Sequence, residues 1–96
     1  MESAVIASST TFFSTGHVTM SFIKVRVGDG TEYYEVGQFD TRPLDLRKHK
    51  WQTLVSNTCD VSARMMFNSA TTLVGEQSRR ELATFAQMRS IVSAVN

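Results

Sequence analysis

Few side chains in this sequence are suited to covalent or metal chemistry. The two histidines, His17 and His49, lie far apart in the sequence, and neither has a metal-ligand spacing with the single cysteine, Cys59. No nucleophile elbow, phosphate-binding loop or zinc-protease motif occurs, and the GDG of residues 28–30 is typical of a turn. The apolar spacing around Cys59 predicts a small buried side chain. We therefore expect no enzymatic activity, no metal and no cofactor.

Residue types suited to binding gather instead in residues 21–39, SFIKVRVGDGTEYYEVGQF. Their alternation and their β-branched and aromatic side chains predict two strands around a two-residue turn at Asp29-Gly30. Counting outward from that turn pairs Arg26 with Tyr33 and Val25 with Tyr34. Successive side chains point to opposite faces of a strand. The face predicted to be core therefore carries Ile23, Val25, Val27, Tyr34 and Val36.

The opposite face of this hairpin mixes aromatic and basic side chains with Met20 and Glu35. Unpaired bases stack on aromatic rings while cations neutralise phosphates, so such a face is typical of a single-strand-binding surface. An ordinary solvated face is the alternative, with Lys24 paired across the strands with Glu35 and the phenylalanines packed beneath another element. The predicted binding residues on this face are Phe22, Lys24, Arg26, Tyr33 and Phe39.

A second basic cluster lies in residues 42–51, RPLDLRKHKW, where Asp45 is the single acid. Trp51, Leu54 and Val55 follow at helical spacing, which predicts an amphipathic helix from about Lys48. The free N–H groups at the start of such a helix suit an anion. A solvated helix start is the alternative. The cluster adds four cations to the predicted nucleic-acid site: Arg42, Arg47, Lys48 and Lys50.

The composition of the chain limits how strongly these basic residues can attract nucleic acid. The chain has 96 residues, enough for one domain, and its 42% apolar and 20% charged residues are ordinary for globular proteins. Ten basic against nine acidic residues give a net charge of +1, so any attraction to nucleic acid must be local. The lone Cys59 permits no internal disulfide, the first residues include Glu2 and no basic residue, and no apolar run approaches membrane length. We therefore expect an intracellular protein, in the cytoplasm or nucleus.

Strand-like patterns precede helical ones along the chain, which predicts an α+β fold. We expect residues 1–11, which are small and hydroxylic, to form a flexible arm before a single domain of residues 12–96. That domain would be a curved antiparallel sheet followed by two or three helices. Ser78 and Glu81 form a capping-box pattern that would open the last helix. The apolar stripe of that helix would be Leu82, Phe85, Met88, Val92 and Val95.

Part of this order resembles the positive cofactor four family of single-stranded-DNA-binding transcriptional coactivators. The similar segments are FFSTGHVTMSFIKVRV, the GDG turn, TEYYEVGQF and PLDLRKHKWQTLV, which together span about residues 12–62. In that family a hydrophobic-x-Leu strand precedes a helix opened by a tryptophan, and the matching positions are Leu44, Leu46, Trp51 and Leu54. The resemblance implies a homodimer joined through its helices, with strands of both subunits binding unpaired DNA. It also implies binding roles for Lys24, Arg26, Phe39 and the basic residues of 42–50.

The sequence therefore favours a small homodimer that binds single-stranded nucleic acid, DNA more than RNA, in support of transcription or replication. A short chain with an apolar run gains stability from a partner, and the predicted dimer contact is Met65, Met66 and Phe67. The alternative is a protein-interaction module, such as a phage or viral inhibitor or assembly factor, with no nucleic-acid role. Near-zero net charge favours that alternative, whereas the spacing from the Leu-x-Leu segment to Trp51 favours nucleic-acid binding.

Overall fold

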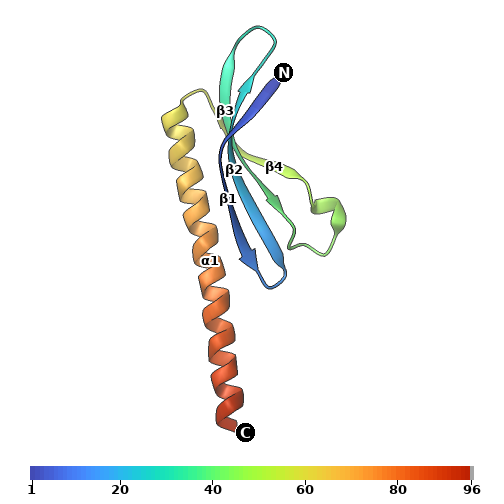
Figure 1. Ribbon diagram of the computed structural model, residues 1–96, viewed down its shortest axis with the longest axis vertical. Coiled ribbons are helices and arrows are strands. Elements are labelled where there is room, and N and C mark those ends of the chain that lie inside the picture. The colour runs from blue at the N-terminus through green and yellow to red at the C-terminus, as the bar shows by residue number, and fades with distance from the viewer. Residues whose placement is uncertain (96) are drawn as a thin grey trace.

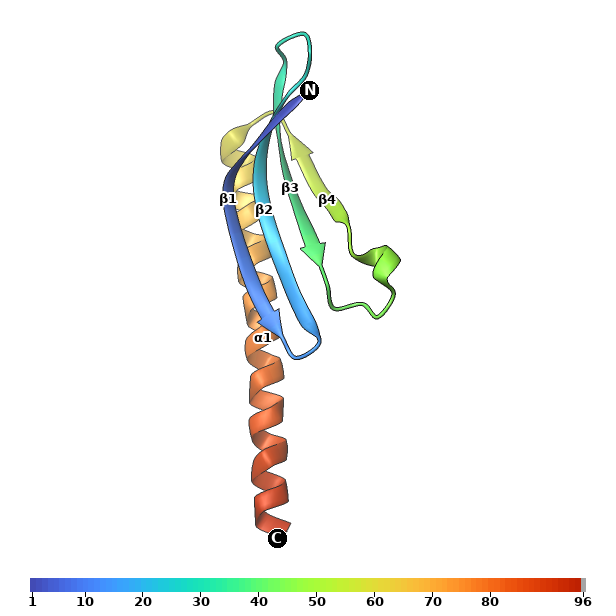
Figure 2. The ribbon, with the colours of Figure 1, turned by 45° about the vertical axis from the view of Figure 1, so that its right-hand side comes forward.

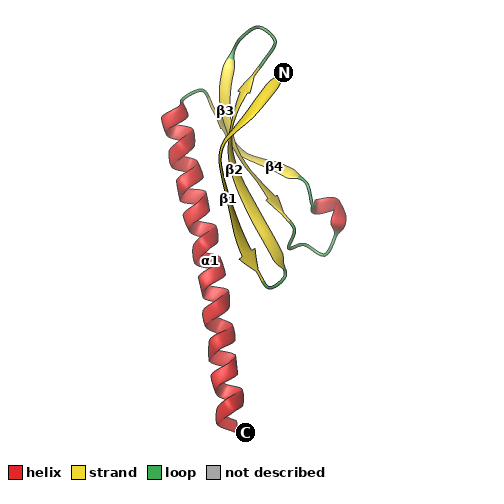
Figure 3. Ribbon diagram, viewed as in Figure 1, coloured by secondary structure: helices red, strands yellow, loops and turns green. Residues whose placement is uncertain are grey.

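The computed structural model describes residues 1–95, which form a four-stranded antiparallel sheet followed by one long helix (Figures 1 and 3). Each strand pairs with its neighbour in sequence, in the order β1-β2-β3-β4. The predicted α+β class and antiparallel sheet are confirmed. Two or three helices were expected, whereas these residues contain a single α-helix and one 3-10 turn. The elements are β1 (Glu2–Phe13), β2 (Gly16–Arg26), β3 (Glu32–Asp40), η1 (Leu46–Lys48), β4 (Trp51–Asn57) and α1 (Asp60–Val95).

Helix α1 packs along one face of the sheet, and its second half runs past the end of the β1-β2 hairpin (Figures 1 and 2). The molecule is consequently elongated, with extents of 67 × 29 × 15 Å. We call the face under α1 the covered face and the other the open face. No helix within residues 1–95 has the length and apolar character needed to cross a membrane.

The core lies between the covered face and the first half of α1. Phe22 is fully buried, and its ring stacks on Tyr34 at a centroid distance of 5.7 Å and meets Phe67 at 6.2 Å. The prediction that Phe22 binds nucleic acid and that Phe67 forms a dimer contact is therefore wrong, because both rings fill the interior. The buried apolar residues of this core are Val18, Met20, Phe22, Val36, Ala63, Phe67 and Val74.

The β2-β3 hairpin has a three-residue loop where a two-residue turn was predicted. The Gly30 N–H donates to the Val27 carbonyl at 2.9 Å, and Gly30 has a φ of 87°, a left-handed conformation that glycine adopts at little cost. Arg26 consequently pairs with Glu32 and Val25 with Tyr33, one residue away from the predicted register. Because a one-residue slip exchanges the faces of a strand, the predicted grouping of β2 with β3 side chains is wrong.

Residues 2–11, expected to be a flexible arm, form most of β1. This strand pairs with the full length of β2, from Glu2 opposite Arg26 to Phe13 opposite Gly16. Its hydroxyl side chains are used in the pairing, since the Thr10 and Thr19 hydroxyls hydrogen-bond across the strands at 2.9 Å. Small hydroxylic residues therefore build an edge strand here, and the prediction of an arm is corrected.

The helix predicted from Lys48 is also absent. Lys48 ends the short η1 turn, and the following residues form β4, which pairs with β3 through Val55 opposite Val36 and Thr53 opposite Gly37. A register shift between Val36 and Gly37 lets this short strand follow the twist of the sheet. The resemblance that placed Trp51 at a helix start therefore does not hold at this position.

Helix α1 begins well before the predicted capping box. Within it, the Ser78 hydroxyl donates to the Phe12 carbonyl at 2.8 Å, and the Ser14 N–H donates to Glu81 Oε1 at 2.8 Å. Both residues therefore fasten the β1-β2 turn to α1 and do not start a helix. The bond from Ser14 also holds the pKa of the Glu81 carboxyl below its ordinary value.

Cys59, predicted to be buried, lies exposed immediately before α1. Its carbonyl accepts the Ala63 N–H at 3.1 Å, and hydrogen bonds from Ser62 lower the pKa of its thiol. It therefore belongs to the start of the helix and not to the core. Of the apolar stripe predicted for the last helix, the Val95 side chain lies outside the described residues.

Candidate nucleic-acid interface

Two aromatic residues of neighbouring strands pair with each other on the open face. The β3-β4 register pairs Phe39 with Trp51, and the two residues are 37% and 39% exposed. Across the sheet, Phe39 pairs with Thr19 and Thr19 with Thr10, so this row of the open face combines aromatic rings with hydroxyl groups. A strand of unpaired bases could therefore meet both stacking surfaces and hydrogen-bonding groups here.

The Trp51 ring packs against the backbone of β3. The ring lies over Gly37, where any Cβ atom would overlap its six-membered portion. The indole N–H donates to the Thr53 hydroxyl at 3.1 Å, which fixes the orientation of the ring. One side of the indole is thus supported by the sheet, while its exposure leaves surface available for a stacked base.

A further aromatic side chain extends this end of the open face toward β1. Phe12 pairs with His17 in the β1-β2 register, is 72% exposed, and has its ring 6.1 Å from the His17 ring. His17 Nδ1 lies 3.2 Å from the Thr41 hydroxyl, so the imidazole is anchored to the segment after β3. The other histidine, His49, bonds through Nε2 to the Pro43 carbonyl at 2.7 Å and orders the β3-β4 loop.

Most of the predicted binding cations are neutralised within the chain. Lys24 lies 3.0 Å from Glu32, and Arg26 forms a shared pair with the same carboxylate. The pairs Arg42–Asp40 and Arg47–Asp45 have distances of 2.9 and 3.1 Å. The hydrogen-bonded Arg42 guanidinium holds the pKa of Asp40 below its ordinary value. Among residues 1–95, the basic candidates without an ion pair are Lys48 and Lys50.

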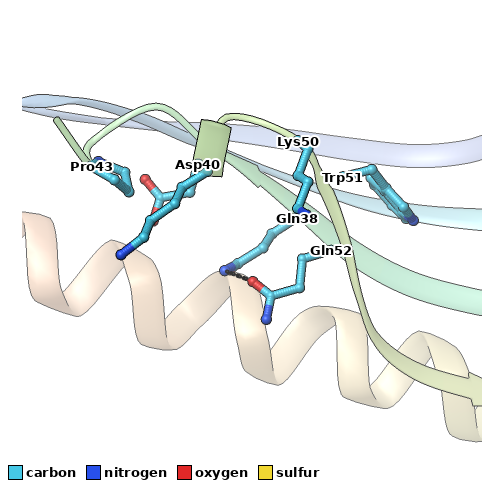
Figure 4. A pocket seen from close by; sticks show the side chains of 7 residues that line it. Gln38, Asp40, Pro43, Lys50, Trp51 and Gln52 are labelled. Atoms are coloured by element: carbon cyan, nitrogen blue, oxygen red, sulfur yellow. Dashed lines mark hydrogen bonds between the residues drawn. The ribbon is translucent and has the colours of Figure 1, made fainter. Parts of the chain in front are cut away.

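These two lysines line a pocket of about 330 Å³ at the β3-β4 edge. Figure 4 shows Lys50, Gln38 and Gln52 directed toward this space, whereas Trp51 points away from it. The two amides are joined by a 3.4 Å contact from Gln38 Nε2 to Gln52 Oε1. Asp40, Pro43 and Trp51 also line the pocket, and its lining includes no residue of α1. Ammonium and amide donors gathered in this way suit a phosphate group.

The structure brings together one part of the predicted site and separates the rest. Phe39, Lys48 and Lys50 lie at the same end of the sheet as Trp51. Tyr33 is on the open face but toward the opposite end of β3, so it does not form one surface with Phe39. Lys24 and Arg26 lie on the same side of β2 as Phe22, which is the covered face.

Sequence reasoning missed several contributors to this site, among them Trp51, Gln38 and Gln52. Trp51 was assigned to the core of a helix, although WQTLVSN is rich in residues that favour strands. A glycine at position 37 within a strand is a signal of close approach by another group, and here that group is the indole ring. Of the predicted dimer contacts, Met65 and Met66 are exposed on α1.

Comparison of the chain with protein families, with curated proteins and with solved structures found no match.

Proposed function

We propose that this protein binds single-stranded nucleic acid, DNA in preference to RNA, across the β3-β4 end of its sheet. The observation that carries the proposal is the cross-strand pair of part-exposed aromatic residues, Phe39 and Trp51, beside two lysines without ion pairs. Such a combination suits stacking of bases together with neutralisation of phosphates. A role in support of transcription or replication, inside the cell in cytoplasm or nucleus, follows from this activity.

Base stacking and phosphate binding would take place on opposite sides of β4. Lys50 and Trp51 are consecutive and point to opposite sides of the strand (Figure 4). A nucleic-acid strand that crosses this edge would stack a base on Trp51 and place a neighbouring phosphate near Lys50 and Lys48. Each stacked base contributes about 1–3 kcal/mol at sites of this kind. Because neither contact reads the edge of a base, sequence selectivity should be slight.

The electrostatic part of binding should be small. With a net charge of +1 and two free lysines at the site, about two phosphates would be neutralised. A plot of log affinity against log salt concentration should then have a slope of about −1.4, at about −0.7 for each phosphate contact on a single strand. A duplex cannot place unpaired bases on the rings and should bind more weakly.

Trp51 gives a direct measurement, because it is the only tryptophan in the chain. Addition of an oligothymidylate should quench its fluorescence, and a duplex of equal length should do so less. Lys50→Gln should lower the affinity and reduce the salt slope by about 0.7. The matched control is Lys24→Gln, which removes the same charge at the other end of the sheet and should leave both unchanged. Absence of quenching and of binding at low salt would refute the proposal, as would equal effects of the two substitutions.

A second candidate is a protein-interaction module, such as a phage or viral inhibitor or assembly factor. The observation that favours it is the exposed apolar surface on the second half of α1, which the sheet does not cover. This surface is formed by Leu82, Phe85, Met88, Ile91 and Val92. A chain with this activity alone would show no response of Trp51 to oligonucleotides.

A further inference from the structure

The face of α1 that packs on the sheet continues beyond the sheet. Phe85, Met88 and Val92 follow Phe67, Ala70 and Val74 by eighteen residues each, which is five turns of an α-helix. The later set therefore points in the same direction as the earlier one, about 27 Å further along the axis. Phe67 and Val74 are buried against the sheet.

In the distal segment of α1, residues 82–93, Leu82 and Phe85 line a pocket with the β1-β2 turn, and the rest of this face extends beyond the turn. Phe85, Met88 and Val92 are 43%, 56% and 59% exposed, and the segment runs past the β1-β2 hairpin (Figure 2). Arg89 is its only charged residue. A helical segment of about this length is marginal in water without packing, and this one has no internal ion pairs to support it.

The size of the exposed surface points to a missing partner. The chain exposes 6742 Å², whereas a compact monomer of its mass exposes about 5,500 Å². Its radius of gyration is 17.5 Å, against about 12.5 Å for a compact domain of this length. The excess of about 1,200 Å² exceeds the surface of about 800 Å² that each partner buries in a standard interface.

We infer that the distal segments of two copies of this chain pair antiparallel, with a two-fold axis near Met88. In this arrangement Met88 meets its own counterpart, and Phe85 of each copy meets the region of Ile91 and Val92 of the other. The ends of the paired helices reach the apolar pocket between the β1-β2 turn and α1, which Phe12, Phe13, Leu82 and Phe85 line. The contact then ends where the hairpin begins, so the sheet of one copy does not obstruct the helix of the other.

Two properties of the segment favour a second copy as the occupant. An apolar stripe with one charged residue can face its own copy with little charge repulsion, and a two-fold contact closes without leaving a free surface for further chains. The contact also continues an interface that already exists within the chain, between the same helical face and the sheet. This inference goes beyond the proposed function, because Trp51 and the lysines at the β3-β4 edge take no part in it.

Light scattering on the full-length chain at micromolar concentration tests the pairing. The expected mass is twice 10.7 kDa for the unmodified chain, and half of that for Met88→Glu. The matched control is Ser90→Glu, which introduces the same charge on the far side of the helix and should remain dimeric. Far-UV circular dichroism establishes that both variants keep the fold. A monomeric unmodified chain, or a dimeric Met88→Glu, would overturn the inference.

Cross-linking locates the axis independently. In a Cys59→Ser background, Met88→Cys should form a disulfide-linked dimer under mild oxidation, whereas Ser90→Cys should not. Equal cross-linking at both positions would contradict the antiparallel arrangement. Quenching of Trp51 by oligothymidylate, measured on Met88→Glu, separates this result from the proposed function. A monomeric variant whose Trp51 is still quenched has lost dimerisation and kept nucleic-acid binding.

Discussion

The indole ring of Trp51 lies directly over Gly37 of the adjacent strand, in space that a Cβ atom would occupy. The glycine therefore determines where the ring of the sole tryptophan can rest. The hydrogen bond from the indole N–H to Thr53 then fixes its orientation. Through this relationship a residue without a side chain controls the most exposed stacking surface of β4.

Gly37→Ala tests this relationship. The added methyl group must displace the ring, and overpacking of this kind lowers the free energy of unfolding by about 1–3 kcal/mol. The emission maximum of Trp51 should shift, and quenching by oligothymidylate should weaken. Urea denaturation and fluorescence measure both effects. Gly28→Ala is the control, since a Cβ at position 28 meets nothing within 4 Å. Unchanged emission in Gly37→Ala would show that the ring does not rest there in solution.

The sequence was sufficient for the fold class and for the β2-β3 hairpin, but not for its register. A GDG segment fits either a two-residue turn at Asp29-Gly30 or a three-residue loop with Gly30 left-handed. These loops differ by one residue, and that difference decides whether Tyr34 or Tyr33 joins Phe22 in the core. Packing of Phe22 between Tyr34 and Phe67 selects the three-residue loop, and such contacts cannot be read from local patterns.

The candidate site was predictable only in part for a similar reason. Phe39, Lys48 and Lys50 were identified as binding residue types, whereas Trp51 was placed in a helix because a few apolar residues fit both helical and strand spacing. Pairing with β3 decides in favour of a strand. The ion pairs that neutralise Arg42 and Arg47 depend on loop geometry, so a count of basic residues overestimated the free positive charge.

Gly30→Ala is expected to destabilise the hairpin without changing binding. A side chain in the left-handed region costs about 1–2 kcal/mol, so the free energy of unfolding should fall by about that amount. Gly28→Ala, in the same loop but without a positive φ, should instead raise stability by about 0.4–1 kcal/mol by restricting the unfolded chain. Urea midpoints for the two variants give the comparison. Equal effects would show that Gly30 does not adopt the left-handed conformation in solution.

The same substitution at two phenylalanines should separate core from interface. Phe22→Ala should lower the free energy of unfolding by about 3–5 kcal/mol, because it leaves a cavity between the sheet and α1. Phe39→Ala should change stability less and weaken binding of oligothymidylate by about 1–3 kcal/mol, through loss of a stacking surface. Thermal unfolding and fluorescence titration measure these quantities. A stable Phe22→Ala that no longer binds would place Phe22 on the interface instead.

Acid should destabilise the fold through carboxylates that are hydrogen-bonded in the native state. The Arg42 guanidinium and backbone N–H lower the pKa of Asp40 from its ordinary value of 3.8. In the unfolded chain this pKa returns to its ordinary value, so the unfolded state binds the proton first as the pH falls. The stabilisation is therefore complete above about pH 5 and is lost as the pH falls through the lowered pKa of the folded state. The pKa of Glu32 is lowered in the same way by hydrogen bonds from Arg26 and Lys24.

Asp40→Asn should reduce stability at pH 7 and flatten the fall in urea midpoint between pH 5 and pH 2, because the variant has no carboxylate to protonate at this position. Arg42→Gln should flatten the same region, since it removes the group that lowers the pKa of Asp40. It should also be less stable at every pH, because Arg42 lies 4.4 Å from the centre of the Phe13 ring and covers it. The decrease in the free energy of unfolding should be smaller for the double variant than the sum of the decreases for the two single variants, as expected for residues in direct contact. If Asp40→Asn kept the full acid sensitivity of the unmodified chain, the pair with Arg42 would not be a source of the pH dependence.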